Sequence, residues 1–78
     1  MSIGNSDPFP HHKAFGALLK QIRESKNFSQ LDLASRCNME KSSISRIENG
    51  RTNITLNTAV LLSTSLGVSL KELFDFEL

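Results

Sequence analysis

The chain has 78 residues, a formal net charge of +1 and a single cysteine, Cys37. That length suits one small domain, and a lone cysteine excludes an intramolecular disulfide and with it a disulfide-stapled secreted scaffold. No apolar run approaches the length of a membrane span, and the N-terminus lacks the basic start and apolar stretch of a signal peptide. We therefore expect a cytoplasmic protein that does not associate with membranes.

The small net charge hides an uneven distribution along the sequence. Residues 13–53 hold eight lysines and arginines against four acidic residues, a net charge of +4, whereas residues 54–78 hold one lysine against three acidic residues, a net charge of −2. The first half could therefore face a polyanion while the acidic end faces away from it. Ordinary surface charge is the alternative explanation, and composition alone does not decide between the two.

The first twelve residues contain Gly4, Pro8 and Pro10 and show no hydrophobic periodicity. We expect residues 1–12 to form a flexible arm and residues 13–78 to form the folded domain. Beyond the arm, apolar residues recur with helical spacing at positions 15, 18, 19 and 22. This pattern predicts a first helix from about His12 to Lys26.

Two short helices separated by a tight turn are expected next. Ser29 is a good helix N-cap, and the apolar face that follows it predicts a helix over about Gln30–Cys37. Asn38 tolerates the left-handed backbone conformation that ends helices and forms turns. A third helix should begin near residue 40 or 41 and end at Asn49–Gly50, where glycine supplies the stop.

The last third of the sequence predicts two more helices. Thr55 can cap a helix over about residues 56–65, which Gly67 ends, and Ser69 can start a short fifth helix with Glu72 completing a capping box. The buried stripe of the fourth helix is expected to comprise Leu56, Ala59, Val60, Leu62 and Leu66. Because no strand-like alternation occurs, the sequence predicts one all-α domain of five helices.

The second and third helices have the outline of a helix-turn-helix. Ala34 is small enough to let the two helices approach closely, and Asn38 can form the turn between them. Ile44 and Ile47 would anchor the third helix from below and leave its opposite face free. That face presents polar side chains able to bond to base edges in the major groove of DNA, namely Lys41, Ser42, Ser45 and Arg46.

At these residues the chain resembles a known family. The stretch FSQLDLASRCNMEKSSISRIENGR, residues 28–51, is similar to the phage-repressor or XRE (Cro/C1) type of helix-turn-helix domain, as is the later LGVSLKELF. The similarity covers roughly residues 13–75. It implies a compact five-helix, lambda-repressor-like DNA-binding domain with residues 41–48 as the recognition helix. It also implies a homodimer on a pseudo-palindromic DNA operator.

The resemblance further implies roles for individual positions. The base-reading positions of the family are matched by Lys41, Ser42, Ser45 and Arg46. The positions that contact the DNA backbone, and so set register and salt-dependent affinity, are matched by Gln30, Ser43, Asn49, Arg51, Thr52 and Asn53. Gln30 would also steady the recognition helix. Arg23 and Glu48 match a structural ion pair between the first and third helices.

Three positions depart from the family pattern. Glu40 stands where the recognition helix more often begins with Ser, Thr or Asp, and its carboxylate would lie close to DNA. There it could weaken binding or orient Lys41. Asn38 replaces a glycine in the turn, and Ile54 replaces a proline common before the fourth helix; neither change threatens the fold.

Apolar residues near the end of the chain predict a surface for self-association. Leu61 is apolar at a position that the family usually exposes, and a chain this small has few reasons to expose much apolar surface. The candidate dimer interface comprises Leu61, Leu70, Phe74, Phe76 and Leu78. The alternative is that these side chains wrap onto the core of their own monomer.

The pattern as a whole favours a sequence-specific DNA-binding transcription regulator of the controller or Cro-like repressor type. No nucleophile–base arrangement, phosphate-binding glycine loop or metal-ligand spacing occurs, so we expect no enzyme activity, cofactor, metal or small-molecule ligand. Adjacent His11 and His12 are poorly spaced to chelate one metal, and Cys37 is expected to be a small buried residue. RNA polymerase is a further candidate partner. The alternative function is an antitoxin or adaptor that uses the same fold mainly to bind another protein.

Overall fold

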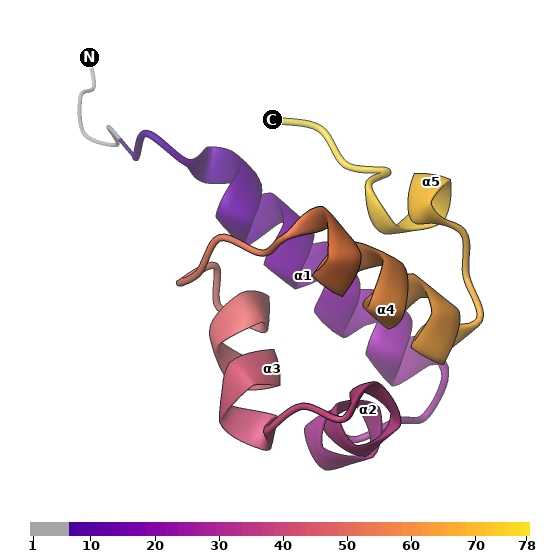
Figure 1. Ribbon diagram of the computed structural model, residues 1–78. Coiled ribbons are helices and arrows are strands. Elements are labelled where there is room, and N and C mark those ends of the chain that lie inside the picture. Colours follow the sequence, from indigo (N-terminus) through magenta and orange to yellow (C-terminus); the bar gives the residue numbers. More distant parts are fainter. Residues whose placement is uncertain (1–6) are drawn as a thin grey trace.

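The computed structural model describes residues 7–78, and within that range the chain is entirely helical apart from turns and loops (Figure 1). Five helices follow one another in the order predicted, and no strand occurs in the described part of the chain, which confirms the all-α fold class. Their bounds are α1 Pro10–Ser25, α2 Gln30–Cys37, α3 Lys41–Glu48, α4 Leu56–Leu66 and α5 Leu70–Leu73.

The first helix begins earlier than the sequence pattern indicated. It starts at Pro10 rather than near His12, with the proline in its first turn. Proline suits this position because its missing N–H would have no helical partner there and its fixed φ is already helical. Residues 10–12 therefore belong to α1, which begins two residues before the start expected near His12. Residues 1–6 of the arm expected over residues 1–12 lie outside the described residues.

Local capping chemistry sets the bounds of α2 and of the turn that follows. The Ser29 hydroxyl accepts a hydrogen bond from the Asp32 N–H, and the Asp32 carboxylate accepts one from the Ser29 N–H, both at 2.9 Å. Asn38 adopts the left-handed conformation with φ of 54° and ends α2. The N–H of Met39 then donates to the carbonyl of Ala34 at 2.9 Å. Both predictions, the N-cap and the turn residue, are confirmed.

The core takes one fully buried large side chain from each helix. These side chains are Leu19, Leu33, Ile44, Leu62 and Leu73. Figure 1 shows α1 running through the molecule, α2 and α3 at one end of the bundle and α5 on the side away from α3. The fourth helix packs against α2 and α5. Because every helix contributes an apolar side chain to the same cluster, the helices hold one another in place.

The buried stripe of α4 differs from the one predicted. Ala59, Leu62 and Leu66 are buried as expected, but Leu56 is 69% exposed and Val60 is 43% exposed, so placing those two in the core was wrong. The helix turns Ser63 toward the interior instead, where its hydroxyl donates to the Val60 carbonyl at 2.8 Å. α4 has apolar residues around more of its circumference than its packing can cover.

The first and third helices approach each other closely enough to require glycine. A Cβ built on Gly16 of α1 would lie less than 3.0 Å from the carbonyl oxygens of Ile47 and Glu48 at the end of α3. Gly50, with φ of 70°, lies against Lys13 of α1 in the same way. The C-terminal end of α3 is therefore pressed against α1, and this contact fixes where α3 lies.

Candidate nucleic-acid interface

The third helix has an inner and an outer face of opposite character. Ile44 and Ile47 are buried in the core, whereas Lys41, Ser42 and Arg46 are exposed. Ser43 and Ser45 are half-buried. The structure thus brings the four side chains predicted to read bases onto one exposed side of a single helix, namely Lys41, Ser42, Ser45 and Arg46.

A buried ion pair anchors the other end of α3 to α1. Arg23 donates from Nε to one carboxylate oxygen of Glu48 at 2.6 Å and from Nη2 to the other at 3.1 Å. Its remaining nitrogen, Nη1, donates to the carbonyl of Phe28 at 2.7 Å. Bidentate charge-assisted bonds of this kind fix orientation as well as distance. The ion pair predicted between these two residues is present.

Gln30 extends this network to the second helix. Its side-chain nitrogen donates to the Glu48 carboxylate at 3.0 Å, so Glu48 at the end of α3 is bonded to both α1 and α2. The hydrogen bond to Glu48 and its negative charge raise the pKa of the Arg23 guanidinium, while burial acts in the opposite direction. Arg23 therefore stays charged. The hydrogen bond from Gln30 to Glu48 corresponds to the steadying role predicted for Gln30. The second N–H of the Gln30 amide is free to donate to another acceptor.

The loop after α3 forms one wall of a hollow beside that helix, lined by both polar and apolar side chains. Its volume is about 200 Å³, and it opens next to Arg46. The predicted backbone-contacting residues Ser43, Thr52 and Asn53 line it together. Thr58 lines it as well, although sequence reasoning did not single it out. The sequence signal that could have identified Thr58 is its position three residues after the Thr55 N-cap, at the start of α4.

Two other predicted DNA-contacting residues lie next to this hollow along the chain. Asn49 is exposed, and its side-chain amide donates to the Ser45 hydroxyl at 3.4 Å. A residue predicted to contact the DNA backbone is therefore hydrogen-bonded to one predicted to read bases. Arg51 is exposed. Both follow the last turn of α3, on the segment that leads into the loop.

Glu40 is the N-cap residue of α3, but its side chain does not cap the helix. The carbonyl oxygen of Glu40 accepts the first hydrogen bonds of α3, from the N–H groups of Ser43 and Ile44 at 3.0 and 3.3 Å. Its carboxylate makes no capping hydrogen bond and is exposed. The main chain therefore fixes the position of this residue while its charged group is left free.

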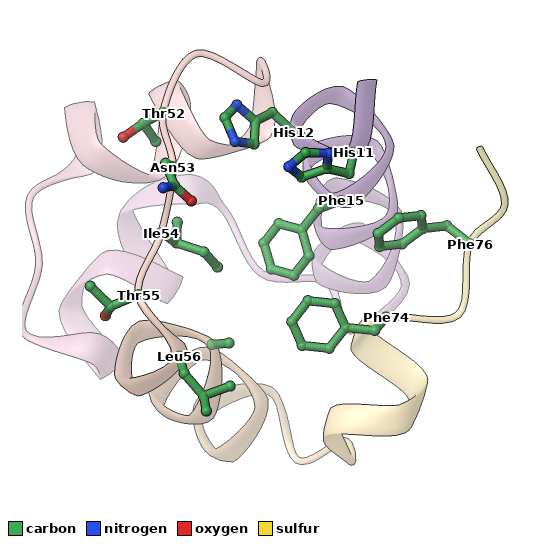
Figure 2. Close-up of a pocket in the computed structure, with 11 residues that line it drawn as sticks. His11, His12, Phe15, Thr52, Asn53, Ile54, Thr55, Leu56, Phe74 and Phe76 are labelled. Atoms are coloured by element: carbon green, nitrogen blue, oxygen red, sulfur yellow. The ribbon is translucent and has the colours of Figure 1, made fainter. Parts of the chain in front are cut away.

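A second hollow, of about 220 Å³, lies between the start of α1, the loop before α4 and the end of the chain (Figure 2). Its walls are mainly apolar and include Phe15, Ile54, Leu56, Phe74 and Phe76, with the two adjacent histidines among its lining residues. Figure 2 shows the phenyl rings of Phe15 and Phe74 lying near each other, and their centroids are 5.2 Å apart.

The candidate dimer residues divide into two groups in the structure. Phe76 packs against the monomer's own core and Leu70 is half-buried, as the alternative explanation required of them. Leu61, Phe74 and Leu78 remain 41%, 43% and 77% exposed. Together with Leu56 and Val60, these residues leave much of the apolar surface of α4 and the chain end uncovered.

The geometry can be compared with known proteins. The sequence profile of the helix-turn-helix family HTH_3 matches residues 19–73, which include all of α2, α3 and α4. This chain belongs to that helix-turn-helix family. The match covers the buried Arg23–Glu48 pair and the exposed face of α3, so it includes the residues from which the candidate interface is built.

Individual proteins resemble the chain over most of its length. It is 44% identical over 63 residues to control protein C.BamHI of Bacillus amyloliquefaciens, covering 80% of this chain and 78% of that protein. It is 38% identical over 62 residues to control protein C.MunI of a Mycoplasma species, covering 78% and 84%. The crystal structure of the restriction-modification controller protein C.AhdI of Aeromonas hydrophila superposes with a TM-score of 0.80 at 30% identity, covering 82% and 97%.

Membership in the helix-turn-helix family makes the chain a DNA-binding transcription regulator and not an enzyme, as the sequence predicted. Within residues 7–78 no helix is both long enough and apolar enough to cross a membrane. In the same part of the helix-turn-helix protein, no three His, Cys, Asp or Glu side chains gather in a way that could hold a metal ion. Cys37 is buried, as expected, and its thiol donates to the Ser65 hydroxyl at 3.2 Å.

Proposed function

We propose that this protein is a restriction–modification controller that binds a pseudo-palindromic operator as a homodimer, with α3 in the major groove. One observation carries the proposal: α3 exposes Lys41, Ser42 and Arg46 while its opposite face and its C-terminal end are held in the core. A helix held from behind in this way can enter a groove without losing its orientation. The similarity to C.BamHI and C.MunI, both named control proteins, supports the controller assignment.

The residue types on α3 suit base recognition. Lysine and arginine donate to guanine O6 and N7, and a serine hydroxyl can bond to either kind of base edge. Lys41, Ser42, Ser45 and Arg46 are the base-reading residues in this proposal. The serines are short enough to let the helix backbone lie deep in a groove about 12 Å wide, while the two cations are long enough to reach to either side.

The polar side chains that line the hollow beside α3 suit the DNA backbone. Ser43, Thr52 and Asn53 offer hydroxyl and amide donors there, and Thr58 adds a further hydroxyl at the start of α4. Phosphate oxygens are the acceptors that such donors meet beside a major groove. Gln30, Asn49 and Arg51 complete the proposed set of backbone contacts, and the net charge of +4 over residues 13–53 supplies the attraction.

The uncovered apolar surface supports the homodimer. Leu61, Phe74 and Leu78 of the predicted interface are exposed, and the exposed Leu56 and Val60 enlarge it. Leu70 and Phe76 are half-buried in the monomer, so they add to the proposed dimer interface only the part of each side chain that remains exposed. Figure 1 shows α5 and the chain end on the side away from α3, so association there leaves α3 free in both protomers. A two-fold dimer would then present its two recognition helices to half-sites about 34 Å apart.

The proposal can be tested by selection from a random DNA library. The selection is repeated at two salt concentrations, at the pH of the bacterial cytoplasm. The expected result is one enriched site with two inverted half-sites a helical turn apart, bound about a hundredfold or more above random DNA. The affinity should fall steeply with salt because each phosphate contact releases counterions. An unenriched library, together with a protein partner that copurifies stoichiometrically, would contradict it and favour the antitoxin or adaptor function.

A further inference from the structure

Glu40 carries a negative charge that nothing in the described part of the chain neutralises. The salt bridges formed by residues 7–78 are Arg23 with Glu24 and Arg23 with Glu48, and neither involves Glu40. The Glu40 carboxylate also makes no hydrogen bond to the start of α3. The Glu40 carboxylate is still attracted to the positive end of the α3 dipole. This attraction involves no hydrogen bond, so the carboxylate oxygens are free to accept hydrogen bonds from another molecule.

The position of Glu40 places this carboxylate close to the bases. The inference rests on the proposed function, in which α3 enters the major groove. Helices of this kind contact base edges with their N-terminal residues, and Glu40 directly precedes Lys41 and Ser42 at that end. The opposite end of α3 cannot take this part, because Ile47 and Glu48 lie against Gly16 of α1. The carboxylate would thus reach the groove on a backbone already fixed by the first bonds of α3.

The chemistry of the groove limits what such a carboxylate can bond. Phosphates repel it, and so do the acceptors that guanine presents at N7 and O6 and thymine at O4. The donors available on base edges in the major groove are the amino groups of cytosine N4 and adenine N6. Beside adenine N6 lies the acceptor N7, which a carboxylate cannot satisfy, whereas glutamate is a suitable acceptor for cytosine N4.

We propose that Glu40 is a specificity-determining residue, whose carboxylate accepts a hydrogen bond from the N4 amino group of a cytosine in each half-site. The same carboxylate excludes guanine and thymine at that position. Its effect on DNA binding is thus unlike that of Lys41 and Arg46. Besides reading bases, those cations add an attraction to the phosphates of every sequence, whereas Glu40 lowers the affinity for all sequences except those that present an amino group to it.

The test compares the wild-type protein with Glu40→Gln and Glu40→Ala by DNA selection and by titration on the selected site and its single-base variants. The wild type should prefer cytosine at one position of each half-site by about fivefold or more over the other bases. Glu40→Ala should abolish that preference. Glu40→Gln keeps the length of the side chain but adds a donor, so it should move the preference to adenine, which glutamine can bond at both N6 and N7.

A matched control removes one negative charge elsewhere. Glu77 is exposed near the end of the chain, and Glu77→Gln should leave every base preference unchanged. If Glu40 only repels DNA, both Glu40 variants will bind all sequences more tightly by the same factor and keep every base preference, which overturns the inference. The Arg46→Ala variant distinguishes a failure of the Glu40 inference from a failure of the proposed function on which it rests. If Arg46→Ala relaxes a base preference while the Glu40 variants do not, the major-groove assignment of α3 stands and only the role of Glu40 is wrong.

Discussion

The Arg23 guanidinium and the Glu48 carboxylate, 25 residues apart in the chain, meet in a buried bidentate pair with N–O distances of 2.6 and 3.1 Å. The pair joins α1 to Glu48, the last residue of α3. Gln30 adds a bond from the second helix to the same carboxylate. The orientation of α3 is therefore set by three helices through one acidic group.

Glu48→Gln tests that anchor. The amide keeps the shape of Glu48 but removes the buried counter-charge of the Arg23 guanidinium, which should lower the free energy of unfolding by about 3 kcal/mol. Chemical denaturation followed by circular dichroism measures the change. Glu24→Gln is the control, because Glu24 is exposed and its carboxylate lies as far as 3.9 Å from Arg23, so its removal should cost less than about 0.5 kcal/mol. Equal losses in the two variants would contradict the anchoring role.

Gly16→Ala tests the close approach of α1 and α3. Alanine favours a helix over glycine by about 1 kcal/mol, so propensity alone predicts a stabilised protein. The added Cβ would instead meet the carbonyl oxygens of Ile47 and Glu48, and we expect a net loss of about 1–3 kcal/mol in the free energy of unfolding.

Gly67→Ala separates this clash from ordinary backbone strain. Gly67 has φ of 70°, but nothing lies within 4 Å of an added Cβ. Its substitution should cost about 1–2 kcal/mol through strain and leave DNA binding unchanged. Gly16→Ala should in addition weaken operator binding, because α3 must shift to relieve the clash. A stabilised Gly16→Ala protein with normal operator affinity would show that the two helices separate easily.

The capping box of α2 should make stability depend on pH in the acid range. Backbone and side-chain hydrogen bonds from Ser29 lower the pKa of Asp32 from its usual value of 3.8. Because the folded-state pKa is depressed, the stabilisation is present above pH 3.8 and is lost as the pH falls through the folded-state value. Asp32→Asn should therefore be less stable than wild type at pH 7, and the difference should shrink toward pH 3. Urea unfolding at both pH values, with Asp75→Asn as control, measures it; a difference that is constant with pH would refute the role of the charge.

Arg46 and Arg51 should differ in the kind of DNA contact that they make. Arg46→Ala should weaken binding to the selected operator by about 1–3 kcal/mol and relax the choice of one base pair. Arg51→Ala should weaken binding to all sequences alike and reduce the slope of log affinity against log salt by about 1. Titrations on the operator and on random DNA at several salt concentrations distinguish the two. If Arg46→Ala leaves both affinity and preference intact, the register assigned to α3 is wrong.

Leu61→Lys tests the proposed dimer surface. Leu61 is 41% exposed on α4, so the substitution should leave the monomer folded but place a charge in the interface. We expect the dimer dissociation constant to rise at least about tenfold, measured by sedimentation at micromolar concentration. Leu31→Lys is the matched control, since Leu31 is 59% exposed on α2, outside that surface. Equal effects of the two substitutions, or a wild-type protein that is strictly monomeric both free and on DNA, would refute the interface.

Much of the fold follows from short-range rules that the sequence displays. Ser29, Asn38 and Gly50 mark a helix start, a turn and a helix stop, because each acts through its own backbone or that of residues a few positions away. The Arg23–Glu48 pair was predicted only from family resemblance, since nothing local relates two residues so far apart. For the same reason, the bond from Gln30 to Glu48 became evident only with the helices packed.

The sequence by itself determined the five helices, the exposed polar face of α3 and the family to which the chain belongs. The tertiary structure alone decided which apolar residues of α4 are covered, because the exposed Leu56 and Val60 are more hydrophobic than the buried Ala59 and differ from it in what packs against them. It alone also decided that Gly16 must have no side chain and that the Glu40 carboxylate stays free. Hydrophobic periodicity reports what a helix can bury, whereas the other helices determine how much of it they cover.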